Sequence, residues 1–317
     1  MIYRHVGKSG LKVSALSLGS WLTYGDTVDA GTAEEIISTA YESGINSFDT
    51  ANCYHNGQAE RVLGKALCRY PRNSLVVASK IFTPMGEGPN DRGLSRKHLT
   101  EQMNAILQRL QMDYVDILYC HRFDGETPLY ETLRTLDDFI RAGKALYIGV
   151  SEWTAAQIEQ ALGIEDRYLL DRIVVSQPLY NLLVRRVESE VLPLCNRHGI
   201  GQMVFSPMAM GMLTGKYRRG CPVPPDSRAA NASIGQWIRG DYFSERNFDK
   251  VERLRAVADK AGIAMADLAL AWLLSREGVC SAIIGASRKE QVLSNLHATE
   301  ITLSQDLLTA IEAAAAD

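Results

Sequence analysis

The stretch YVDILYCHRFDGETPLYETLRTLDDFIRAGKALYIGVS, residues 114–151, contains two short apolar runs separated by an amphipathic segment. Each run is rich in Val, Ile, Leu and Tyr and has polar or Gly residues at its ends, which is typical of a strand buried on both faces of a parallel sheet. Between the runs, apolar residues recur at three- and four-residue spacing, Pro128 stands at a first-turn position and Gly143 closes the pattern. The stretch therefore predicts a strand, a helix and a second strand.

The same unit repeats along the chain. Eight apolar runs alternate with amphipathic segments, and the runs end at Gly19, Asp49, Lys80, His121, Ser151, Gln177, Ser206 and Gly285. Strand–helix alternation repeated eight times is the pattern of a (β/α)8 barrel. A short hairpin over residues 2–16 precedes the first run. We therefore predict an α/β fold, a (β/α)8 TIM barrel with an N-terminal β-hairpin, in which residues 1–317 form a single domain.

One interval between run ends is much longer than the others. It lies between Ser206 and Gly285, and its additional part, roughly 208–249, contains CPVPPDS and other turn-rich pieces. We expect a long loop at the barrel mouth before the eighth strand. The competing architecture, an open doubly wound sheet, requires a phosphate-binding loop after its first strand, and residues 15–25 (ALSLGSWLTYG) contain no G-x-G-x-x-G.

Composition excludes several classes of protein. The 317 residues are 46% hydrophobic and 22% charged, which argues against disorder and against coiled coil. With 34 basic and 37 acidic residues the chain has no excess of positive charge that would attract a polyanion, so we expect no nucleic-acid partner. No apolar run reaches the roughly 18 residues of a membrane span, and MIYRHVGKSG lacks the core of a signal peptide. We therefore expect a cytoplasmic protein without a membrane partner, whose six scattered cysteines are reduced.

The candidate acid–base residues lie at or just after the ends of three neighbouring apolar runs. The carboxyl ends of barrel strands face one way, so Asp49, Lys80 and His121 would converge, with Tyr54 shortly after the second run. A Lys at the inner end of a buried strand is costly unless it is paired, and Asp49 is its natural partner. A purely structural ion pair remains the alternative interpretation.

A tyrosine beside this pair indicates acid–base chemistry. A phenol has a pKa of about 10, and a neighbouring ammonium stabilises the phenolate. Lys80 would thus make Tyr54 a better proton donor, while Asp49 keeps Lys80 charged and oriented. His121 would hydrogen-bond the same substrate oxygen, although a core histidine satisfied by the backbone is the alternative. The cysteine and histidine spacing predicts no metal site.

Several longer motifs carry a resemblance that covers nearly the whole chain. They include YRHVGKSGLKVSALSLG (3–19), GINSFDTANCYHNGQAERVLGKAL (44–67), RLQMDYVDILYCHR (109–122), SPMAMGMLTGKY (206–217) and SAIIGASRKEQVLSNL (281–296). The most specific are F-D-T-A-x-x-Y, the S-K that follows it, and G-x-S-x-x-x-Q near the end. On these motifs the chain resembles the aldo-keto reductase superfamily, within it the branch of the potassium-channel β subunits and their bacterial relatives.

The resemblance implies a TIM barrel that binds NADPH/NADP+ at its mouth and transfers hydride to a carbonyl. Asp49, Tyr54, Lys80 and His121 match the catalytic tetrad of the family, with Tyr54 as proton donor. Some channel subunits have Asn at the last position. The His of this chain favours a working reductase over the alternative, an NADP(H)-sensing regulatory subunit with little turnover.

The resemblance also assigns cofactor contacts. Those at the nicotinamide end are Gly19, Ser20, Trp21, Asp49, Ser151 and Gln177. Those along the dinucleotide and its phosphates are Ser206, Pro207, Met208, Ala209, Met210, Lys216 and Arg228. Those at the adenosine 2′-phosphate and adenine are Gly285, Ser287, Gln291 and Asn295. A helix start at Ser287 suits a phosphate because its N–H groups are free. Ser294 stands where close relatives have an adenine-contacting Glu, which leaves NADH as the alternative dinucleotide.

Aromatic residues in or next to the strand-end loops predict the walls of a substrate pocket. They are Trp21, Tyr24, Phe82, Trp153 and Trp237. The substrate expected is a small-molecule carbonyl compound: an aldehyde, a ketone or a nucleotide-linked ketosugar. Relatives in this branch form tetramers and larger rings, so the resemblance also implies a homo-oligomer.

Overall fold

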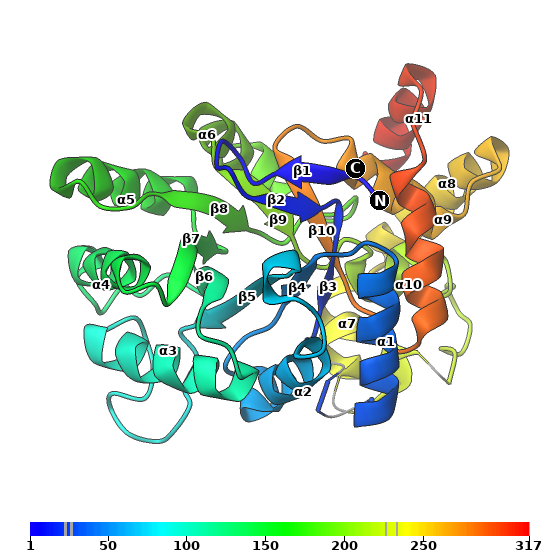
Figure 1. Cartoon of the computed structure of the whole chain (residues 1–317). Coiled ribbons are helices and arrows are strands. Elements are labelled where there is room, and N and C mark those ends of the chain that lie inside the picture. The colour runs from blue at the N-terminus through cyan, green and yellow to red at the C-terminus, as the bar shows by residue number, and fades with distance from the viewer. Residues whose placement is uncertain (22–23, 26–27, 226, 233, 317) are drawn as a thin grey trace.

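Eight parallel strands close into a barrel in the computed structural model, which describes residues 1–317 except 22–23, 26–27, 226, 233 and 317. Around the ring every neighbouring pair is parallel, and the order is β10-β3-β4-β5-β6-β7-β8-β9 (Figure 1). The strands are β3 (Leu16–Gly19), β4 (Ser47–Asp49), β5 (Val76–Ile81), β6 (Val115–Cys120), β7 (Ala145–Ser151), β8 (Ile173–Gln177), β9 (Gly201–Val204) and β10 (Val279–Ile284). The predicted (β/α)8 barrel is confirmed.

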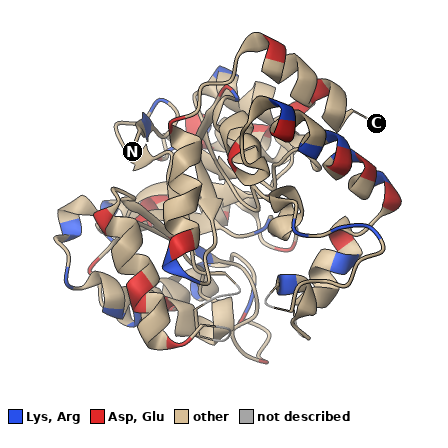
Figure 2. Ribbon diagram, turned by 90° about the vertical axis from the view of Figure 1, so that its right-hand side faces the viewer, with Lys and Arg blue, Asp and Glu red and all other residues tan. Residues whose placement is uncertain are grey.

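Helices surround the ring of strands (Figure 1). Their bounds are α1 (Ala30–Glu42), α2 (Gln58–Leu67), α3 (Arg96–Leu110), α4 (Leu129–Arg141), α5 (Ala155–Tyr168), α6 (Val191–His198), α7 (Gly235–Tyr242), α8 (Glu245–Ala261), α9 (Met265–Leu274), α10 (Lys289–Leu296) and α11 (Gln305–Ala315). Several begin at a side-chain cap, such as Ser95 before α3 and Thr154 before α5, where Gln157 completes a capping box. In the view of Figure 2, basic and acidic positions are interspersed over the outer helices.

The N-terminal hairpin lies across the amino-terminal end of the barrel. Strands β1 (Tyr3–His5) and β2 (Lys12–Ser14) pair antiparallel, as predicted. Val6 and Val13 are fully buried and belong to the same apolar cluster as Ile117 and other residues of the barrel interior. The hairpin therefore closes the end of the barrel opposite the strand ends that carry the candidate site.

The long insertion lies between β9 and β10, as the sequence predicts, and it contains regular structure. Two 3-10 turns, η4 (Ala209–Thr214) and η5 (Arg228–Ala230), are followed by α7. The sequence expectation of a plain loop over 208–249 is therefore too simple, because α7 and the start of α8 fall within it. Among the described residues no helix is long and apolar enough to cross a bilayer.

Strand β5 carries one charged and one hydroxyl side chain next to each other on opposite faces. Ser79 and Lys80 are both fully buried. Successive side chains of a strand point to opposite faces, so Ser79 faces outward to Glu60 on α2, whereas Lys80 faces into the barrel. This alternation fixes which of the two residues belongs to the barrel mouth.

Candidate active site

The four titratable residues predicted at the strand ends lie together at the barrel mouth. Asp49 ends β4, Lys80 is the next-to-last residue of β5, and His121 directly follows β6. Tyr54 begins the 3-10 turn η1 (Tyr54–Gly57), which connects β4 to α2. Three neighbouring strands thus bring a carboxylate, an ammonium, an imidazole and a phenol to one place.

The Lys80 ammonium is the centre of the group. It forms a buried ion pair with Asp49 through Oδ1, and it donates to the Thr50 carbonyl at 2.7 Å. Its third proton points to the Tyr54 hydroxyl, with Nζ and Oη 3.3 Å apart. An ammonium has three donors, so every one of them has an acceptor here. The buried charge is consequently paired and hydrogen-bonded, as its desolvation requires.

Asp49 is held from both sides. One carboxylate oxygen accepts from Lys80, and the other accepts from Nε2 of Gln177 at 2.8 Å. Gln177 ends β8, and its carbonyl accepts a hydrogen bond from the Ser151 hydroxyl at 2.9 Å. The backbone N–H of Ser20 donates to the Asp49 carbonyl at 2.9 Å. Four residues predicted near the nicotinamide therefore belong to one hydrogen-bond network.

The protonation states follow from burial and charge. Burial raises the pKa of Tyr54 to about 12, although the Lys80 charge acts in the opposite direction. Burial acts to lower the pKa of Lys80, but the Asp49 charge and the hydrogen bonds to Asp49 and Tyr54 outweigh it, so this pKa lies above its usual value. Burial, with the nearby charges of Lys80 and Arg122, holds the pKa of His121 well below 6.5. At neutral pH the group is therefore a phenol, an ammonium and a neutral imidazole.

This result corrects one expectation. The sequence argument has Lys80 bring the pKa of Tyr54 below its ordinary value, and Lys80 does act in that direction. Desolvation of the phenol is the larger effect, so the pKa rises. Tyr54 remains protonated at neutral pH and keeps the proton that a donor needs.

The turn after Tyr54 has an unusual backbone. His55, Asn56 and Gly57 have φ angles of 46°, 53° and 82°, all in the left-handed region. Such conformations cost roughly 1–3 kcal/mol each for residues with a side chain, and they cluster at functional sites. Gly57 is required here because a Cβ would lie 2.6 Å from Cδ of Arg109. The Tyr54 ring that precedes this turn lies 6.5 Å from the Trp21 ring and 5.8 Å from the His121 ring, measured between ring centroids.

A second strained segment follows β9 and contains the predicted dinucleotide contacts. Ser206, Ala209 and Met210 have φ angles of 50°, 48° and 53°, and Pro207 and Met208 lie between them. The Ser206 carbonyl accepts from Nδ2 of Asn181 at 3.0 Å, which ties the segment to the loop after β8. The predicted contacts over 206–210 therefore form one compact turn at the mouth of the barrel.

Two of the residues predicted to contact phosphates lie near glycines. Nη2 of Arg228 would be 2.7 Å from a Cβ at Gly285, so this guanidinium lies directly against the glycine. Among the described residues no carboxylate pairs with Arg228, and burial lowers its pKa. Lys216 lies over the Tyr217 ring at 5.3 Å, and a Cβ at Gly211 would be 2.9 Å from its Cε.

The predicted adenosine contacts gather around the start of α10. The Ser287 backbone N–H donates to Oε1 of Gln291 at 2.8 Å, and the Ser287 hydroxyl lies 3.3 Å from the same oxygen. Asn295 is buried, and its Nδ2 finds no hydrogen-bond partner within the described parts of the chain. A buried amide nitrogen without an acceptor is uncommon in native structures. Asn295 therefore offers a free donor at the position expected for a ligand.

The aromatic residues predicted for the substrate pocket differ in exposure. Trp21 and Phe82 are half-buried beside the tetrad strands, and Trp237 is 53% exposed on α7. Tyr24 and Trp153 are buried. Trp153 packs edge-on against Phe123 at 4.9 Å, a residue that the sequence analysis does not identify.

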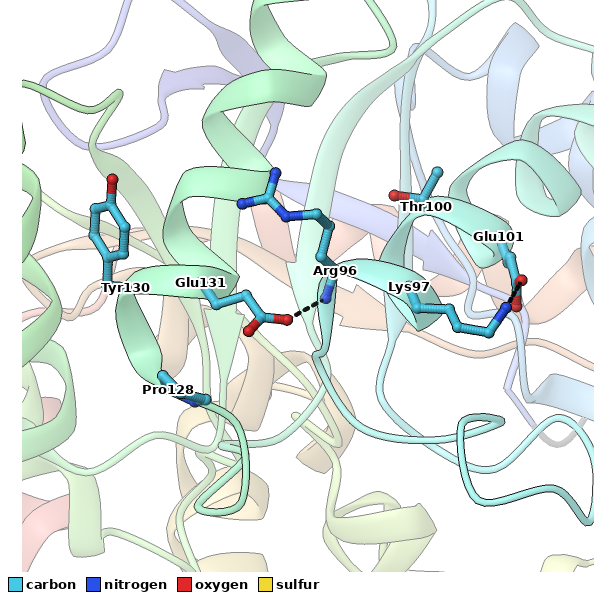
Figure 3. A pocket seen from close by; sticks show the side chains of 7 residues that line it. All are labelled: Arg96, Lys97, Thr100, Glu101, Pro128, Tyr130 and Glu131. Atoms are coloured by element: carbon cyan, nitrogen blue, oxygen red, sulfur yellow. Dashed lines mark hydrogen bonds and ion pairs between the residues drawn. The ribbon is translucent and has the colours of Figure 1, made fainter.

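A hollow of about 820 Å³ lies elsewhere, on the outer wall between α3 and α4 (Figure 3). Its charged side chains already have partners: Lys97 pairs with Glu101, and Glu131 accepts from the Arg96 backbone N–H at 2.9 Å. The hollow contains none of the predicted site residues. Within the described residues, no group of three or more His, Cys, Asp or Glu could hold a metal ion. We therefore place the candidate site at the barrel mouth.

Comparisons with known proteins agree with this geometry. A family model described as "Aldo/keto reductase family" matches residues 15–316. A protein of Arabidopsis thaliana named "Probable voltage-gated potassium channel subunit beta" is 45% identical over 304 residues, 95% of this chain and 92% of that protein. A protein of the same name from Oryza sativa subsp. japonica is 41% identical, over 99% of this chain and 96% of its own length. The resemblance inferred from the motifs is confirmed.

Proposed function

The chain belongs to the aldo/keto reductase family, and from this premise we propose that it is an NADPH-dependent reductase of a small carbonyl compound. The observation that carries the proposal is the Lys80 ammonium, buried between the Asp49 carboxylate and the Tyr54 hydroxyl, with a neutral imidazole beside them. A structural ion pair alone does not require a phenol and an imidazole at the same strand ends.

The residues present fit a dinucleotide. Arg228 lacks a carboxylate partner in the described chain and lies against Gly285, while Asn295 has a buried donor without an acceptor. Arg228 would hold phosphate, Ser287 would hold the 2′-phosphate at the start of α10, and Asn295 would bind the adenine. Bound NADPH supplies the hydride. Ser151 and Gln177 would bind the carboxamide at the other end of the cofactor.

The chain's own residues complete the reaction. The Tyr54 hydroxyl donates its proton to the carbonyl oxygen as negative charge develops there. Lys80 then stabilises the phenolate, and Asp49 with Gln177 keeps the ammonium in place. Neutral His121 donates one N–H to the same oxygen and orients the carbonyl. In the reverse direction the Tyr54 phenolate accepts the proton of an alcohol.

A second function is favoured by the names of the two plant relatives. Both are called probable channel β subunits, so this chain is alternatively an NADP(H)-sensing subunit that associates with another protein and turns over slowly. The complete tetrad, with His121 rather than Asn, favours the reductase. We further propose a cytoplasmic location and self-association, which light scattering of the purified chain would measure.

The test is consumption of NADPH over a panel of aldehydes, ketones and nucleotide-linked ketosugars. We expect turnover with at least one class, and Tyr54→Phe lowers kcat by about a hundredfold to ten-thousandfold while cofactor binding is retained. Tyr41→Phe is the matched control, because it removes a hydroxyl that bonds Ser74 on the outside of the barrel. Tight NADPH binding with no turnover on any carbonyl refutes the reductase and favours the sensing subunit.

A further inference from the structure

Cys53 differs in position from the other five cysteines. Three of those are buried in the core and two are exposed, whereas Cys53 is half-buried at the barrel mouth, next to Tyr54 in the chain. Its Sγ lies 3.8 Å from Nδ1 of His121, within hydrogen-bond range for sulfur. Within the described part of the chain this is the one hydrogen bond found for the His121 ring. The thiol is therefore the hydrogen-bond partner of Nδ1 of His121.

Both the Cys53 thiol and the His121 imidazole are neutral. Burial raises the pKa of the Cys53 thiol, although a hydrogen bond with Thr83 and the Lys80 charge act in the opposite direction. Burial also holds the pKa of His121 far below its ordinary value. A reactive cysteine requires a thiolate, and burial disfavours that form here. The interaction that remains is an S–H donor facing an imidazole nitrogen.

A neutral imidazole carries a single N–H, and the partner of one nitrogen decides which nitrogen holds it. We propose that Cys53 is a positioning residue that donates its S–H to Nδ1 of His121 and thereby keeps the imidazole proton on Nε2. The inference rests on the proposed reductase function, in which His121 must donate a hydrogen bond to the carbonyl oxygen. With Nδ1 occupied by the thiol, Nε2 carries the donor for the substrate.

Thr83 also contributes to the surroundings of the thiol. A hydrogen bond with its side chain acts to lower the pKa of Cys53, against the larger effect of burial. Thr83 follows β5, Cys53 follows β4 and His121 follows β6, so the three residues come from three neighbouring strand ends.

The direct test is the tautomer of His121 in the full-length chain. Protein labelled with 15N at histidine is examined by long-range 1H–15N correlation, and loss of one ring signal in His121→Asn identifies the residue among six histidines. We expect the wild-type ring to carry its proton on Nε2. In Cys53→Ala we expect a mixture of the two tautomers, and in Cys53→Ser, which keeps a donor, a return toward the wild-type signal.

Kinetics provide a second readout. Cys53→Ala should lower kcat about threefold to tenfold, as the loss of one modest hydrogen bond implies, with the KM for NADPH unchanged. Cys68→Ala is the matched control, since this exposed thiol donates only to the Lys65 carbonyl and lies outside the site. Thermal unfolding of each variant separates a folding defect from a positioning effect.

The inference is overturned by a wild-type proton on Nδ1, by a Cys53→Ala ring that keeps the wild-type tautomer, or by an unchanged kcat in that variant. Failure of the proposed function has a different signature, which is the absence of turnover on every carbonyl tested. In that case the tautomer measurement alone decides the inference, because it requires no substrate.

Discussion

Two buried ion pairs lie on either side of strand β5. Inside the barrel Lys80 pairs with Asp49, and outside it Glu60 of α2 pairs with Arg109 of α3, whose Nε is 2.5 Å from Oε2. Ser79, the neighbour of Lys80, donates its hydroxyl to the other Glu60 oxygen at 2.6 Å. Both carboxylates are almost completely buried, so each needs close partners to offset the loss of water.

The difference lies in the third partner. Around Glu60, both oxygens are occupied by Ser79 and Arg109, which do not exchange protons near neutral pH. Around Lys80, the last ammonium proton meets the Tyr54 hydroxyl, a group that can release its own proton. The same type of pair therefore stabilises packing at one face of β5 and, in the proposed function, supports proton transfer at the other.

The largest expected effect comes from Lys80→Met. Removing the ammonium leaves Tyr54 without the charge that stabilises its phenolate, so we expect kcat to fall about a thousandfold. The unpaired Asp49 carboxylate also lowers the free energy of unfolding. Steady-state rates and denaturant unfolding measure the two effects, with Lys65→Met on the exposed face of α2 as control. Turnover equal to that of the control would falsify the role of Lys80 in proton transfer.

Arg109→Met tests the outer pair. Breaking a buried ion pair by removing one partner costs about 3–5 kcal/mol in the free energy of unfolding, while Met keeps the alkyl stem that packs on Gly57. Among molecules that remain folded, kcat should stay within about threefold of the wild type. The double variant Arg109→Met with Glu60→Gln should recover part of the stability, because it removes the buried charge. A large loss of kcat in folded protein would mean that the outer pair also serves the chemistry.

The gentlest test, which changes no residue, is the pH dependence of the reverse reaction. Alcohol oxidation needs the Tyr54 phenolate, and the pKa of about 12 means that this form is scarce at neutral pH. The oxidation rate should therefore rise about tenfold per pH unit through the alkaline range in which the protein stays folded. Carbonyl reduction, which needs the phenol, should stay flat over the same range. A plateau of the oxidation rate near neutral pH would contradict the raised pKa.

The barrel and the tetrad were predictable because strand–helix alternation determines both the fold and the direction of strand ends. Asp49, Lys80 and His121 end three apolar runs, so their meeting follows from topology. The sign of the Tyr54 pKa shift was not predictable, since it depends on the depth of burial, which spacing does not encode.

The directions of loop side chains could not be predicted from the sequence either. The sequence places Tyr24 and Trp153 near the mouth, but the direction of a loop side chain has no periodic signal, and both residues are buried. The sequence analysis distinguishes Cys53 in no way from the other five scattered cysteines. Its contact with His121 joins residues 68 positions apart in the chain, and no sequence spacing encodes such a contact.

The hairpin that closes the floor of the barrel also bears on the order of folding. Nη1 of Arg4 donates to the carbonyls of Leu274 at 2.7 Å and Val279 at 2.9 Å, so the hairpin makes contacts with residues about 270 positions further along the chain. Sequence separations of this size slow folding, because the chain must close a very long loop before it gains the contact. The barrel closes only when β10 pairs with both β3 and β9, so its last strand in the chain completes the ring and the native contacts of the hairpin together.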